Sequence, residues 1–78
     1  MKRTYKKAPV ERQRLAQTFT LGQRVKITKV NFPEVEHHAR FVGATGTVTK
    51  IVKTQGELCV STDNLGLRYC FPENLEAA

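Results

Sequence analysis

Basic side chains gather at the start of this 78-residue chain. Residues 1–17 hold six of the 13 lysines and arginines against one acid, Glu11, a net of +5, whereas residues 18–78 carry only +1. Such an arm can bind the phosphates of a nucleic acid through counterion release, which is the favoured interpretation; the alternatives are a solvated tail and a segment that binds an acidic protein. The six side chains are Lys2, Arg3, Lys6, Lys7, Arg12 and Arg14.

Further basic side chains fall in the body of the chain and extend a phosphate-binding footprint. They are Arg24, Lys26, Arg40, Lys50 and Lys53. Among the aromatic residues, Phe32, Phe41 and Tyr69 are candidates for base stacking, which contributes about 1–3 kcal/mol per base. The alternative is that Phe41 and Tyr69 belong to the core and that the lysines line a solvated strand face.

A long polar connection over residues 31–44 is the second candidate site. Pro33 excludes it from a central strand, and loops longer than a hairpin often carry function. Five of its residues form a candidate partner-binding loop: Phe32, Val35, His37, His38 and Phe41. The adjacent histidines lack the paired spacing of a structural zinc site, so we expect no metal and no cofactor.

The two cysteines, Cys59 and Cys70, are expected to be buried free thiols in a reducing compartment, with a disulfide or redox pair as the alternative. They flank the turn at residues 63–66. A two-residue turn would set the cysteines opposite each other, whereas a glycine-bulge turn, which we favour, would set Val60 opposite Cys70.

No group of residues favours catalysis. The chain has one aspartate, Asp63, which suits a turn, and its one serine, Ser61, falls within a strand. A single domain of this size buries only a thin core, so we expect neither an enzyme nor a small-molecule substrate.

Five short strands must position these side chains. Period-two alternation predicts strands near residues 24–29, 45–54, 57–62 and 67–71, with a 3₁₀ turn at 72–75 and a short last strand that Leu75 closes. Residues 9–17 predict only a transient helix. We expect a flexible basic arm over residues 1–18 and one all-β domain over residues 19–78. The predicted core is Val25, Ile27, Val48, Leu58, Val60, Leu67, Tyr69, Phe71 and Leu75.

A strongly bent sheet that closes into a small barrel would hide its edges and make a single core. No apolar run is long enough for a signal peptide or a membrane span, so a cytoplasmic protein without membrane association is expected.

Two stretches, "LGQRVKI" and "FVGATGTVTKIV", resemble the KOW motif of NusG-type transcription factors and ribosomal proteins. The motif positions hold Gly22, Val25, Gly43, Gly46 and Val48, together with Ile27. The ending "LRYCFPENLE" is similar to the last strands and 3₁₀ turn of SH3-like barrels. The resemblance implies a five-stranded SH3-like barrel. The glycines at 43 and 46 are expected to turn the chain with positive φ.

We therefore expect a non-enzymatic accessory protein that binds nucleic acid, RNA more than DNA, with a transcription or translation assembly as its setting. The alternative is an SH3-like protein-interaction module that acts as a regulatory or accessory subunit. In that case the loop at residues 31–41 docks the partner.

Overall fold

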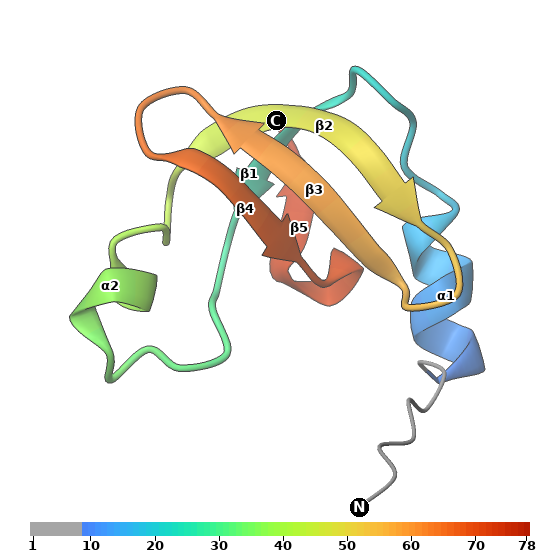
Figure 1. Ribbon diagram of the computed structural model, residues 1–78, viewed down its shortest axis with the longest axis horizontal. Helices are drawn as coiled ribbons and strands as arrows, with labels where there is room; N and C mark the ends of the chain where they lie inside the picture. The colour runs from blue at the N-terminus through green and yellow to red at the C-terminus, as the bar shows by residue number, and fades with distance from the viewer. Residues whose placement is uncertain (1–8) are drawn as a thin grey trace, which may run out of the picture.

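One five-stranded antiparallel sheet dominates the computed structural model, which describes residues 9–78 (Figure 1). The strands are β1 Arg24–Ile27, β2 Thr45–Val52, β3 Glu57–Thr62, β4 Gly66–Cys70 and β5 Leu75–Ala77. The helices are α1 Val10–Ala16, α2 Glu36–Ala39 and the 3₁₀ helix η1 Pro72–Asn74. The strand order is β4-β3-β2-β1-β5, and α1 and α2 lie at opposite ends of the sheet.

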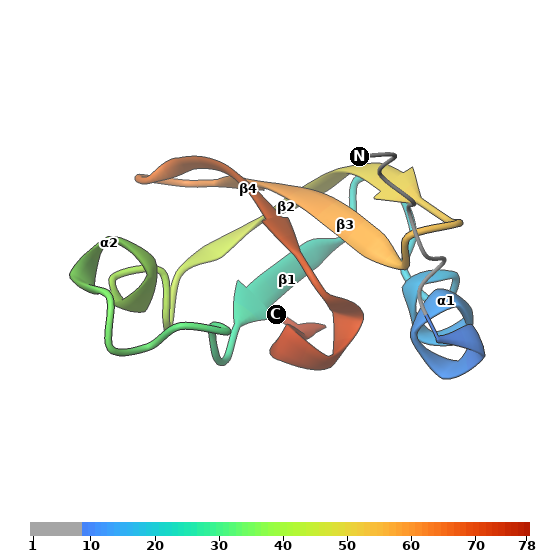
Figure 2. The same ribbon diagram turned by 60° about the horizontal axis from the view of Figure 1, so that its bottom comes forward.

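The sheet is strongly bent but open. Figure 2 shows β1 and the C-terminal segment lying below β3 and β4. Within the described residues β4 and β5 form the two edges and share no ladder, so the expected closed barrel is not observed. After β4, η1 carries the chain across to β1, where Leu75 pairs with Ile27 and Ala77 with Val25, and β4 keeps one unpaired edge.

The core lies on the concave side of this sheet. Six of the nine predicted core residues are buried there, in the strands where apolar side chains alternate: Val25, Ile27, Val48, Leu58, Val60 and Leu75. Ala16, Val30, Phe41, Cys59 and Cys70 are buried as well. Two predicted core residues, Leu67 and Tyr69, are instead 68% and 54% exposed, and Phe71 is half-buried.

The β3–β4 turn explains this difference. Leu58 pairs with Cys70 and Cys59 with Tyr69, so both registers considered from the sequence are wrong. A three-residue turn separates the strands, because the Thr62 hydroxyl accepts from the Leu65 N–H at 3.0 Å and donates to the Gly66 carbonyl at 2.5 Å. This register turns Cys70 toward the core and Tyr69 away from it.

Residues 9–18, expected in a flexible arm, contain the docked helix α1. Ala16 is fully buried against the core. The Arg12 guanidinium donates to the Glu73 carboxylate at 2.7 and 3.0 Å, and its Cζ lies 4.0 Å from the centre of the Phe71 ring. These tertiary contacts hold a seven-residue helix that is too short to be stable alone.

The two glycines before β2 have different roles. Gly43 has φ +89°, a conformation that favours glycine, and its N–H donates to the Ile27 carbonyl at 2.7 Å. Gly46 has no positive φ, contrary to the expectation. It faces β3 so closely that a Cβ would lie 2.5 Å from the Ser61 carbonyl oxygen. Gly46 is therefore a packing glycine.

Candidate functional site

The convex side of the sheet, which we call the outer face, carries the candidate site. Residues directly opposite each other in neighbouring strands share a face. One row of paired residues is Arg24, Thr47, Ser61 and Leu67, and the next contains Lys50, Cys59 and Tyr69. The outer face consists of Arg24, Lys26, Thr45, Thr47, Lys50, Val52, Glu57, Cys59, Ser61, Leu67, Tyr69 and Glu76.

An aromatic ring and lysines share this face. Tyr69, on edge strand β4, is 54% exposed. Lys50 on β2 is exposed as well, and it lies two strands from Tyr69, with the buried Cys59 of β3 between the two residues. At the usual strand spacing, Lys50 and Tyr69 are about 10 Å apart. A bulge at Thr49 shifts the β2 register, which is what brings Lys50 opposite Cys59. Lys26, on β1, is exposed opposite Thr45.

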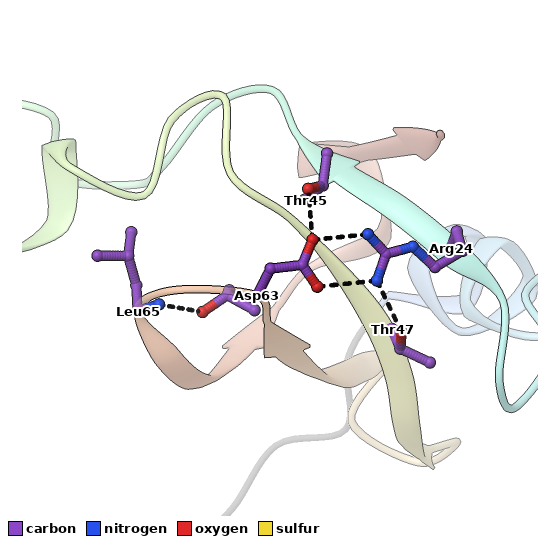
Figure 3. A network of polar contacts seen from close by, with 6 residues as sticks. Arg24, Thr45, Thr47, Asp63 and Leu65 are labelled. Atoms are coloured by element: carbon purple, nitrogen blue, oxygen red, sulfur yellow. Dashed lines mark hydrogen bonds and ion pairs between the residues drawn. The ribbon is translucent and has the colours of Figure 1, made fainter.

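Arg24, by contrast, is held in a polar network (Figure 3). It forms a two-pronged ion pair with Asp63, with Nη1 to Oδ1 at 2.9 Å and Nη2 to Oδ2 at 2.6 Å. Arg24 Nη1 also donates to the Thr47 hydroxyl at 3.0 Å, and the Thr45 hydroxyl donates to Asp63 Oδ2 at 2.8 Å. The network ties β1 and β2 to the β3–β4 turn.

The ion pair changes the titration of both partners. The hydrogen bond from Arg24, with help from that of Thr45, lowers the pKa of Asp63 from 3.8 to about 2. The same hydrogen bond raises the pKa of Arg24. The Asp63 carboxylate therefore already balances the charge of Arg24.

The other predicted phosphate contacts are dispersed. Arg14 is exposed on α1, Lys53 in the β2–β3 turn, and Arg40 after α2 with its Cζ 5.7 Å from the Phe41 ring centre. Arg12 is held by Glu73, as described above. The remaining four, Lys2, Arg3, Lys6 and Lys7, lie outside the described residues.

The predicted partner loop divides into exposed and buried parts. Phe32 is 57% exposed and Val35 is 42% exposed. Phe41 is only 4% exposed, so its role is to anchor the loop in the core and it presents no free surface to a partner. His37 and His38 lie on the one-turn helix α2, which was not predicted from the sequence.

Arg68 links this loop to β4. Its Cζ lies 4.6 Å from the Phe41 ring centre, and its Nη1 lies 3.2 Å from His38 Nδ1. The His37 ring meets Phe41 edge-on with centres 6.5 Å apart. Arg68 was not predicted as a site residue, because the predicted burial of Leu67 and Tyr69 would turn Arg68 toward solvent.

Both cysteines are buried free thiols, as predicted. Burial raises the pKa of Cys70 from 9.0 to about 11. Within residues 9–78 no group of three or more histidine, cysteine or acidic side chains is placed to hold a metal ion. No helix in this part of the chain is long and apolar enough to cross a membrane.

Comparisons with known proteins identify no relative. No protein-family model, curated protein or solved structure matches this chain. The KOW resemblance therefore stays a prediction.

Proposed function

We propose that this protein binds single-stranded nucleic acid on the outer face, without catalysis. The observation that carries the proposal is the exposed Tyr69 ring, which shares a face with Lys26 and Lys50. A base stacks on an aromatic ring while lysines neutralise neighbouring phosphates, which is how sequence-tolerant binding of single strands works.

RNA is the favoured form of the strand. The Ser61 hydroxyl lies on the outer face in the row next to Tyr69 and can exchange hydrogen bonds with a ribose 2′-hydroxyl. The basic residues at positions 2, 3, 6 and 7 would add phosphate contacts. The one aspartate, Asp63, is already engaged with Arg24, which leaves it poorly suited to act as a catalytic acid or base.

The same proposal includes a fold family and a cellular role. The 3₁₀ helix η1 before the short strand β5 supports kinship with SH3-like barrels, and the KOW resemblance supports a cytoplasmic role in a transcription or translation assembly. The open edge between β4 and β5 would then be a departure from the closed barrel.

The test is fluorescence anisotropy with a labelled mixed-sequence RNA hexamer at several salt concentrations. We expect Tyr69→Ala to weaken binding by about 1–3 kcal/mol, while Tyr69→Phe retains the affinity because its ring still stacks. Lys50→Ala should reduce the slope of log K against log salt by about 0.7. An RNA affinity that changes neither with salt concentration nor on Tyr69→Ala would refute the proposal.

A second candidate function is protein binding by the α2 loop. The observation that favours it is the exposure of three apolar side chains, Phe32, Val35 and Val42, on the segment anchored by Phe41. In a quantitative pull-down, Phe32→Ser should release a bound partner and Tyr69→Ser should retain it. The opposite pattern would assign the partner to the outer face.

A further inference from the structure

A small pocket opens at the edge of β4, where the sheet fails to close. Its volume is about 150 Å³. Lys29 and Asn31, from the segment after β1, line one side, and Arg68, Tyr69 and Phe71 line the other. The pocket exists because β4 has no strand partner on this side.

The polar groups in the pocket are held in place. Asn74 is only 6% exposed, and its Nδ2 donates to Asn31 Oδ1 at 3.2 Å. Its backbone carbonyl accepts from the Thr28 N–H at 2.8 Å, which fixes η1 against the end of β1. The pocket therefore has a prearranged pair of carboxamides, one of them buried.

The size and the charges restrict the ligand. A volume of about 150 Å³ equals roughly five waters in the liquid, well below the roughly 300–1,000 Å³ of drug-sized sites, so it suits a single planar ring. Lys29 and Arg68 bring positive charge, but Glu57 also lines the pocket with a carboxylate. That carboxylate disfavours a phosphate inside and favours a group that donates hydrogen bonds.

We propose that this pocket receives one nucleobase of a strand bound on the outer face, and that Glu57 accepts a hydrogen bond from its exocyclic amine. The inference rests on the proposed function. Tyr69 belongs to both the outer face and the pocket lining, so a strand crossing from Lys50 to Tyr69 reaches the pocket with its next nucleotide.

This arrangement specifies a base preference. Carboxylates accept from the N4 amine of cytosine, whereas uracil presents a carbonyl oxygen at the same position, which a carboxylate repels. The carboxamides of Asn31 and Asn74 suit the mixed donors and acceptors of a base edge, and Lys29 and Arg68 suit the flanking phosphate. Cytosine is therefore the expected occupant over uracil.

The experiment compares labelled hexamers of cytidine and of uridine by fluorescence anisotropy at one fixed salt concentration, with the full chain. We expect the cytidine hexamer to bind about tenfold more tightly. Glu57→Gln should bring the two affinities within about twofold, because a carboxamide can donate to the uracil carbonyl. The control is Glu36→Gln, which makes the same charge change at an exposed position on α2, outside both the pocket and the outer face, and should retain the preference.

Two results would overturn the inference alone: equal binding of both hexamers by the unmodified protein, or an undiminished preference in Glu57→Gln. Binding of neither hexamer would overturn the proposed function together with the inference. Should Glu57→Gln fail to fold, Glu57→Ala, which also removes the carboxylate, tests the same hydrogen bond and should also reduce the preference for cytidine.

Discussion

Replacing Gly46 by alanine is the sharpest test of how β2 and β3 pack. The added Cβ would lie 2.5 Å from the Ser61 carbonyl oxygen, and ordinary van der Waals contact begins at 3.4 Å. The obstacle is backbone, so the two strands must separate by about 0.9 Å. Overpacking of this kind costs about 1–3 kcal/mol, and weakening one nearby ladder hydrogen bond adds about 0.5–1.5 kcal/mol.

We therefore expect Gly46→Ala to lose about 2–4 kcal/mol of unfolding free energy, a large share of the roughly 4–12 kcal/mol typical of a 78-residue domain. The matched control is Gly43→Ala. Its Cβ would meet nothing within 4 Å, so its positive φ alone should cost about 1–2 kcal/mol.

The assay is urea unfolding followed by far-ultraviolet circular dichroism, with the slopes compared to confirm two-state behaviour. A Gly46→Ala variant that is as stable as Gly43→Ala, or more stable, would refute the close approach of β2 and β3. Failure of Gly46→Ala to fold, under conditions in which Gly43→Ala folds, would agree with it.

Three further predictions concern individual contacts. Because the folded-state pKa of Asp63 is depressed to about 2, its contribution to stability should be present above about pH 4 and disappear as the pH falls toward 2; the difference in urea midpoint between the unmodified protein and Asp63→Asn should vanish over that range. Cys70, buried and with its pKa raised to about 11, should react with a thiol reagent at pH 8 far more slowly in the folded protein than in urea, and equal rates would contradict its burial. Arg12→Ala should lose about 1–2 kcal/mol through the partly buried Glu73 ion pair and the Phe71 ring contact, and amide exchange in α1 should accelerate. Unchanged exchange there would show that Ala16 alone docks the helix.

The strands were predictable from the sequence where the apolar residues that alternate along the chain are also the ones that are buried in the structure. Val25 and Ile27 in β1, and Leu58 and Val60 in β3, fall on the face that their spacing indicates. The 3₁₀ helix was predictable because Pro72 suits a first helical position. These features depend on local sequence, which is why the sequence was sufficient to find them.

The face of β4 was not predictable in the same way. Its apolar residues Leu67 and Tyr69 alternate like core residues, yet the hydroxyl of Thr62 closes a turn that reverses them. Relative to a two-residue turn, which would set Cys59 opposite Cys70, the observed register is shifted by one residue, and such a shift moves every side chain of a strand to the other face. The candidate site therefore depends on a single turn whose geometry the residue types alone did not determine.

The two helices were underestimated for a related reason. α2 has four residues and no side-chain cap, so nothing local favours it, and the burial of Phe41 just after it supplies the support. Likewise, the pairing of Arg12 with Glu73 joins residues 61 positions apart in the chain. Sequence patterns report contacts between near neighbours well and contacts of this range poorly.

The open edge of β4 has a consequence for the behaviour of the protein at high concentration. An unpaired strand that exposes Leu67 and Tyr69 is a template for self-association with a second copy. The net charge of +6 opposes such contacts, and this repulsion fades as salt shortens the Debye length from about 10 Å at 0.1 M to about 3 Å at 1 M. A bound strand would cover the same edge while neutralising the same charge, so ligand binding and aggregation would compete for one surface.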